Sequence, residues 1–324
     1  MKKQLLIAAV AATMTSAAMA DISISGNAKF EYQNVETTAL ATNTNKTNTE
    51  VNLKLRGKSG DTTVVVDVAA NGADSNANGS GLVVEDQYIT TKVGDVSIKA
   101  GNYASSTSGL LGEIDQGGRS NNKVTLTTTL GGATVYVGNG GASTGSTDFT
   151  SVNNNMFAGI SMDVAGMTVQ AKKVSEIENA YGISGEMAGV ALRLEQRQKD
   201  GANKDVTFGN VTTDVNGISL GYAWIDADAN GLVDEDDSAI FAVENAGSGD
   251  ANQQLTVSTS VAGNKVTLKS GAIGFASAAD QDYMQVSASR ALASGATASV
   301  TYTDKETGTA TDQQTFEAEL SVKF

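Results

Sequence analysis

The acid-rich segment 226–237 has the residue types and spacing of a calcium-binding loop. Oxygen-bearing side chains stand at positions 1, 3, 5, 9 and 12 of the segment, and Gly231 stands at position 6, where such loops turn sharply. The Leu232 carbonyl would supply the ligand at position 7, and the side-chain ligands would be Asp226, Asp228, Asn230, Asp234 and Asp237. We therefore expect one structural Ca²⁺. Because position 12 is Asp rather than the longer Glu, the alternative is a solvated acidic loop.

The composition excludes most catalytic chemistry. The chain contains no His and no Cys, which rules out Ser-His-Asp and Cys-His catalysis and the usual zinc ligands. Chemistry that uses carboxylates, Lys or Ser alone remains open. The formal net charge is −14, and such an acidic chain should repel nucleic acid.

Two-residue alternation is the dominant pattern along the chain. In the final segment 316–324, five apolar residues from Phe316 to Phe324 alternate with Glu317, Glu319, Ser321 and Lys323. This pattern is typical of a strand with one face toward an apolar medium and the other toward water. It recurs at 22–32, 51–56, 96–100, 167–172, 190–197 and 265–269.

Basic residues fall on the polar phase of several of these strands. A charge on the lipid face at mid-depth would cost about 2–4 kcal/mol, so we expect these side chains to point into a lumen or to lie near a rim. They are Lys54, Arg56, Lys99, Lys172, Arg193 and Arg197.

The connections between candidate strands alternate between tight turns that contain Gly or Asp and long polar stretches. Such a rhythm indicates a transmembrane antiparallel β-barrel with short periplasmic turns and long external loops. We count eighteen strands, and sixteen fit equally well if two weak hairpins within 174–214 are misread. A soluble β-sandwich or a β-solenoid also alternates, but a sandwich rarely reaches this length, and the chain shows no fixed repeat.

The N-terminus has the features of a secretory signal peptide. Lys2 and Lys3 precede a short apolar run that ends in Ala18-Met19-Ala20, and cleavage would follow Ala20. The expected organisation is a signal peptide at 1–20 and one barrel domain at 21–324. Without its two leader lysines the mature chain would have 20 basic and 36 acidic residues, a net charge of −16.

The two ends together resemble the general porins of Gram-negative bacteria. The resemblance rests on Asp21-Ile22-Ser23-Ile24-Ser25-Gly26 after the signal, and on the alternating last strand that ends in Phe324. It implies a homotrimer of sixteen-stranded barrels in the outer membrane, in contact with lipid and lipopolysaccharide. A terminal aromatic residue like Phe324 is similar to the signal that the outer-membrane assembly machinery reads.

The resemblance also implies that the third long loop, here 102–121, folds into the barrel and narrows it. Its apolar Leu110, Leu111 and Ile114 suit a position inside the lumen. Glu113, Asp115 and Arg119 are then the candidates for the pore constriction. The alternative is an ordinary surface loop.

We therefore expect passive diffusion of ions and small hydrophilic solutes, selected by size and by the charges that line the pore. Because acidic residues are in excess, a modest cation preference is expected. The alternatives are an adhesin or structural surface barrel, and a barrel enzyme, which would normally use the His that this chain lacks.

Overall fold

A computed structural model describes residues 21–38, 42–71, 81–104, 110–111, 119–139, 156–174, 178–199, 205–228, 240–243, 251–275, 279–307 and 312–324. The predicted signal peptide lies outside these residues. The strands are β1 (Asp21–Thr37), β2 (Thr42–Ser59), β3 (Thr62–Asn71), β4 (Gly81–Val93), β5 (Val96–Ala104), β6 (Arg119–Leu130), β7 (Ala133–Asn139), β8 (Met156–Val164), β9 (Met167–Val174), β10 (Glu178–Met187), β11 (Val190–Lys199), β12 (Val206–Val215), β13 (Ile218–Ala227), β14 (Ala251–Val261), β15 (Asn264–Gly274), β16 (Gln281–Ala291), β17 (Ala296–Thr307) and β18 (Gln313–Lys323).

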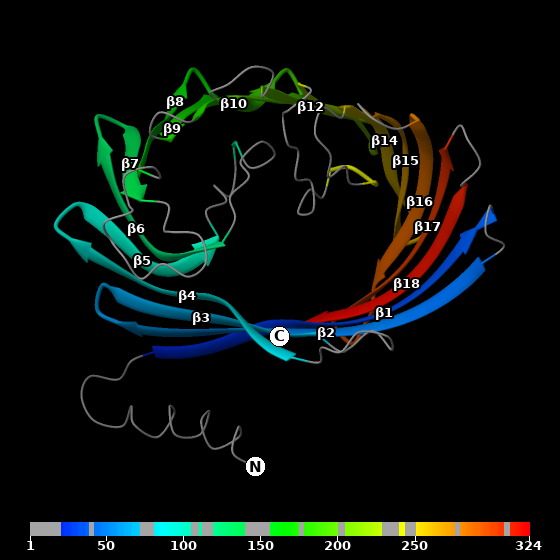
Figure 1. Cartoon of the computed structure of the whole chain (residues 1–324), viewed down its shortest axis with the longest axis horizontal. Coiled ribbons are helices and arrows are strands. Elements are labelled where there is room, and N and C mark those ends of the chain that lie inside the picture. The colour runs from blue at the N-terminus through cyan, green and yellow to red at the C-terminus, as the bar shows by residue number, and fades with distance from the viewer. Residues whose placement is uncertain are drawn as a thin grey trace, which may run out of the picture.

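The strands form one closed antiparallel barrel, which Figure 1 shows as a continuous wall around a lumen. Every strand pairs with its sequence neighbours, and β1 pairs with both β2 and β18, which leaves the sheet without a terminal edge. The barrel has 18 strands. The raw count of eighteen is therefore correct, and sixteen, which the sequence analysis considered equally consistent and which the porin resemblance implies, is wrong for this chain.

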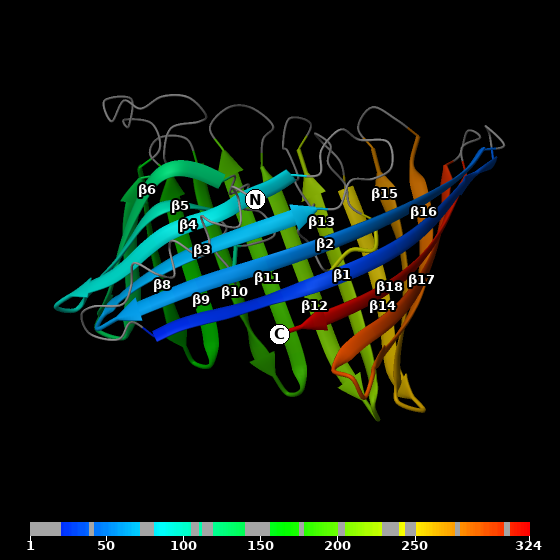
Figure 2. The ribbon, with the colours of Figure 1, turned by 90° about the horizontal axis from the view of Figure 1, so that it is seen from below.

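The segment 174–214, where two hairpins could have been misread, contains well-formed strands. There β10 and β11 form a hairpin whose tight turn is Ala188-Gly189, with φ of 54° and 79°. Positive φ at both central positions matches the twist of the flanking strands, and Gly adopts it without strain. The short hairpin turns lie together at one rim, which runs from the left side to the bottom of Figure 2. The structure's described part contains no helix long and apolar enough to span a bilayer.

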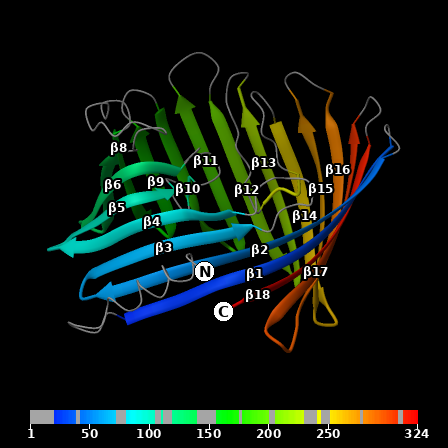
Figure 3. The same cartoon turned by 60° about the horizontal axis from the view of Figure 1, so that its bottom comes forward.

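The outer face of the barrel is apolar. Large exposed hydrophobic side chains lie on one phase of the strands around the wall seen in Figure 3, for example Ile24, Phe30, Val124, Leu220, Leu268 and Phe316. Their exposure would be costly in water but is favourable in lipid, as in a transmembrane barrel. The opposite phase carries the polar side chains and faces the lumen.

Glycines in the wall let aromatic rings lie flat against it. A Cβ at Gly159 would lie within 2.6 Å of ring atoms of Tyr136, and one at Gly138 would lie within 2.9 Å of ring atoms of Phe157. Both glycines are on the lumenal phase of their strands, β8 and β7. The rings therefore spread over the glycine backbone instead of standing up into the lumen.

Candidate functional site: the lumen

The six predicted wall residues all lie on the lumenal phase of their strands, but they do not form one cluster. Lys54 on β2 pairs with Asp67 on β3, with 3.0 Å between Nζ and Oδ2. Arg193 on β11 pairs with Glu195, which is buried, as is Arg197. Lys99 and Lys172 lie between these two groups along the wall, on β5 and β9.

Lys99 belongs to a strip of alternating aromatic and lysine side chains on the lumenal wall. Its ammonium lies 4.0 Å from the ring centroids of both Tyr88 and Tyr103. Lys123 follows at 4.9 Å from Tyr103 and 6.0 Å from Phe157, and Lys172 lies 5.9 Å from Phe157. Cation–π contacts of this kind contribute about 0.5–2 kcal/mol each, so the rings hold the lysines against the wall.

Lys123, which is buried, is missing from the wall residues predicted by sequence. The alternation of Lys123, Thr125 and Thr127 with Val124 and Leu126 would have revealed it. We predicted the third loop at 102–121, and this range includes the polar first residues of β6.

The third long loop enters the barrel at Leu110 and Leu111. A Cβ at Gly182 on β10 would lie 2.7 Å from Cγ of Leu110 and 2.8 Å from Cδ2 of Leu111, so both side chains rest on the opposite wall. Leu111 is fully buried in a cluster with Phe208, Ile225 and other apolar residues of β10–β13. These contacts agree with the expected inward fold of the loop.

Of the three predicted constriction residues, only Arg119 lies within the described residues. Glu113 and Asp115, together with Ile114, lie outside the described residues. Arg119 is the first residue of β6, and the structure describes its backbone. The assignment of these three to the constriction stays a prediction.

A second inward segment, Ile240–Val243, was not predicted from the sequence. Phe241 packs edge-on against Phe208, with ring centroids 6.4 Å apart, in the same cluster as Leu111. Val243 packs against Ile273 and Tyr283. The apolar run Ile240-Phe241-Ala242-Val243 within an acidic stretch was the signal that should have been recognised.

Side-chain amides of the wall fix this second segment. Gln254 donates to the Ile240 carbonyl at 2.6 Å and accepts from the Ala242 N–H at 2.6 Å. Asn252 donates to the Val243 carbonyl at 2.9 Å. Gln254 and Asn252 are each only 1% exposed, and hydrogen bonds this far from water are costly to break. The segment is therefore anchored to β14.

A hydroxyl-rich cavity of about 630 Å³ remains beside this segment. Ile240 and Ala242 form one side of it, and its charged lining residues are Lys265, Lys269, Lys305 and Glu317. Thr and Ser side chains from β12 to β18 supply most of the rest. Such a lining can exchange hydrogen bonds with water and with small polar solutes.

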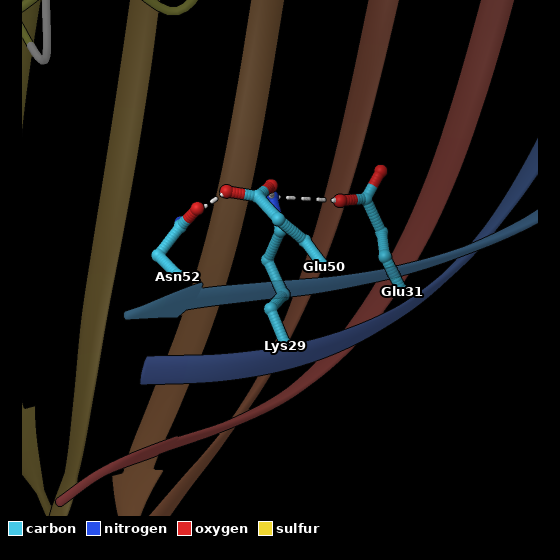
Figure 4. A network of polar contacts seen from close by, with 4 residues as sticks. All are labelled: Lys29, Glu31, Glu50 and Asn52. Atoms are coloured by element: carbon cyan, nitrogen blue, oxygen red, sulfur yellow. Dashed lines mark hydrogen bonds and ion pairs between the residues drawn. The ribbon is translucent and has the colours of Figure 1, made fainter. Parts of the chain in front are cut away.

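Acidic residues gather on the neighbouring wall formed by β18, β1 and β2. Carboxylate oxygens of Glu31, Glu317 and Glu319 lie within 4.8 Å of one another. Lys29 lies between two acids, 3.2 Å from Glu31 and 3.5 Å from Glu50, and Asn52 donates to Glu50 (Figure 4). Glu31, Glu50, Glu317 and Glu319 are called the lumenal acidic group below.

The predicted calcium segment is described only at its start. Asp226 lies within β13, paired with Thr207 and Ala251, and the Asp228 carboxylate accepts a hydrogen bond from the Asp205 N–H at 3.4 Å. Asn230, Leu232, Asp234 and Asp237 lie outside the described residues. Calcium binding stays a prediction. Calorimetry of the protein against an Asp226→Ala and Asp228→Ala double variant checks it, and equal heats would refute it.

Phe324 closes the barrel seam. Its N–H donates to the Gly26 carbonyl at 3.0 Å, and the Gly26 N–H donates to the Phe324 carbonyl at 2.8 Å. The side chain of Phe324 is 57% exposed on the outer, apolar face. Its role in assembly stays a prediction. Its position makes it the final residue of the β1–β18 hydrogen-bond ladder.

No protein-family model and no curated protein sequence matches the chain. Solved structures do match over nearly the whole chain. OpdL of Pseudomonas aeruginosa has a TM-score of 0.67 at 10% identity, covering 94% of this chain and 99% of that one. OccK3 (OpdO) of the same species has 0.66 at 11% identity, covering 94% and 96%. OccAB4 of Acinetobacter baumannii has 0.62 at 11% identity, covering 94% and 98%. At this level of identity, the likeness shows the fold.

Proposed function

We propose that this chain is an outer-membrane porin through which ions and small hydrophilic solutes diffuse passively. The observation that carries the proposal is a closed 18-stranded barrel with an apolar outer face and a polar lumen that contains a hydroxyl-lined cavity. A barrel of this size is too wide for its wall side chains to fill. The resemblance of the two chain ends to porins supports the same function.

Selection of solutes would occur where the two inward segments narrow the lumen. Leu110-Leu111 and Ile240–Val243 both pack on the wall from β10 to β16 and leave the side nearer β17, β18 and β1 as the open path. A solute on that path meets lysines of β15 and β17 on one side and the lumenal acidic group on the other. Charges of both signs facing each other orient polar solutes and exclude large apolar ones.

We also propose the finer properties that the sequence analysis expected. The excess acid of the chain and the lumenal acidic group favour a modest cation preference. The association into a homotrimer and the contacts with outer-membrane lipid, lipopolysaccharide and the assembly machinery rest on the resemblance at the two ends.

Recording from the purified protein in a planar bilayer tests the function. We expect discrete, ohmic conductance steps that grow with salt concentration, grouped in threes if three pores insert together. Single, ungrouped steps would contradict the homotrimer but not the pore. The proposed function would be contradicted if the protein inserts, as judged by its heat-modifiable gel mobility, but gives no conductance.

A further inference from the structure

A trough on the outer face of the barrel has features that a lipid contact surface does not require. It lies across β13–β16 at the ends joined by the long connections, and its volume is about 520 Å³. Its floor is made of small residues, Ala251, Ala272 and Gly274, all on the outward phase. The bulky residues of the apolar belt are absent from this floor, so the described wall is hollowed here.

One side of the trough is an ordered aromatic pair. Tyr222 and Trp224 are stacked, with ring centroids 5.8 Å apart and an interplanar angle of 29°. The Tyr222 hydroxyl donates to Oε1 of Gln253 at 3.2 Å, which leaves the Gln253 amide N–H₂ on the trough. Trp224 lies over Gly209, where a Cβ would come within 2.5 Å of the indole ring. The pair is therefore fixed in position.

The other polar groups of the trough are carboxylates. Asp226 stands beside the aromatic pair, and Asp280 and Asp282 stand on the opposite side. None of the described residues that line the trough is basic. Within the part of the chain that the structure describes, these three acids are not among the groups whose oxygens converge closely enough to hold one metal ion. The Asp280 carboxylate accepts the Phe275 N–H at 3.4 Å, and carboxylate oxygens can each accept further hydrogen bonds.

Together these groups match the chemistry of a sugar ring. Aromatic faces pack against the C–H face of a sugar, and carboxylates and amides bond its hydroxyls. A phosphate headgroup would instead meet uncompensated negative charge. We propose that the trough binds the neutral sugar headgroup of an outer-leaflet glycolipid. The proposal rests on the membrane-inserted barrel of the proposed function, but not on conductance.

Trp224 is the single tryptophan of the chain, so its fluorescence reports this site alone. The full mature protein is reconstituted in phosphatidylcholine nanodiscs that contain increasing fractions of monoglucosyl diacylglycerol. We expect a saturable change in Trp224 emission and protection from acrylamide quenching. Phosphatidylglycerol, added in the same fractions, should produce neither effect. A response of equal size to both lipids would show a general interfacial aromatic residue and overturn the proposal.

A Gln253→Leu and Asp282→Ala double variant removes a side-chain amide donor and a carboxylate acceptor but keeps Trp224 as the reporter. We expect it to need roughly tenfold more glycolipid for the same response, the effect of losing about two hydrogen bonds. Glu36→Gln, a neutralisation on the outward phase of β1, is the matched control and should respond like the parent. An unchanged response in the double variant would also overturn the proposal. Single-channel conductance of both variants should equal that of the parent. A loss of conductance would count against the proposed pore function and not against the glycolipid site.

Discussion

At the scale of single residues, the seam between Gly26 and Phe324 leaves no room for a larger side chain at position 26. A Cβ at Gly26 would lie 3.0 Å from the Phe324 ring and closer still to the Asn52 carbonyl oxygen. Gly26→Val should therefore displace Phe324 and weaken two backbone hydrogen bonds, at a cost of about 1–3 kcal/mol. We expect a lower yield of heat-modifiable barrel on refolding into liposomes, and deletion of Phe324 should lower the amount in the outer membrane.

Gly57→Val is the control for this prediction. Gly57 lies on the same outward phase of the neighbouring strand β2, and a Cβ there would meet nothing within 4 Å. It should refold like the parent. If both valine variants refold equally well, the seam does not depend on the close approach at Gly26.

At the scale of elements, the anchored segment Ile240–Val243 should set the width of the open path. Gln254→Leu removes the two hydrogen bonds to Ile240 and Ala242 and leaves those backbone groups unsatisfied, a cost of about 1–3 kcal/mol each. We expect the segment to leave the wall part of the time. Single-channel records should then show frequent switching between current levels, whereas we expect steady levels from the parent.

Ser258→Ala, on the same face of β14 and on the same cavity, provides the comparison. It removes a hydroxyl from the path without touching the segment, and its records should be as quiet as those of the parent. Quiet records from Gln254→Leu would mean that apolar packing of Phe241 and Val243 holds the segment without the amide.

At the scale of the whole molecule, ion selectivity reports the summed charge of the lumen. Fixed carboxylates concentrate cations on the path, and salt screens this effect with a Debye length of about 10 Å at 0.1 M. We expect reversal potentials that show a modest cation preference which fades as salt rises. Glu317→Gln with Glu319→Gln, and separately Glu113→Gln with Asp115→Asn, should each reduce it.

Asp304→Asn neutralises an acid on the outward phase of β17 and should leave the reversal potential unchanged. Anion preference in the parent would show that the lysines of β15 and β17 dominate the path. If the Glu317→Gln, Glu319→Gln variant shifts the reversal potential and the Glu113→Gln, Asp115→Asn variant does not, the selectivity filter lies on the wall and not on the third loop.

The sequence alone was sufficient for the fold class and for the side of the wall on which each charge lies. Strand alternation has a period of two, so Lys99 or Arg193 is assigned to the lumen as soon as its apolar neighbours are assigned to lipid. The raw count was eighteen, but the alternation alone did not exclude sixteen; the closed sheet decided between them, with the β10–β11 hairpin at Ala188-Gly189 as one of its pairs.

Only the tertiary structure decided which of these residues meet. Lys99 and Lys172 are joined through aromatic rings on intervening strands, and Leu111 contacts Phe208 across the lumen. Such contacts depend on strand register, closure and the path of the loops, which no local period encodes. The outer trough was missed for the same reason, because its sides and floor come from β13–β16, which become neighbours in space only when the sheet forms. The apolar run Ile240–Val243 was visible in the sequence, but its contacts with Asn252 and Gln254 of β14 were not.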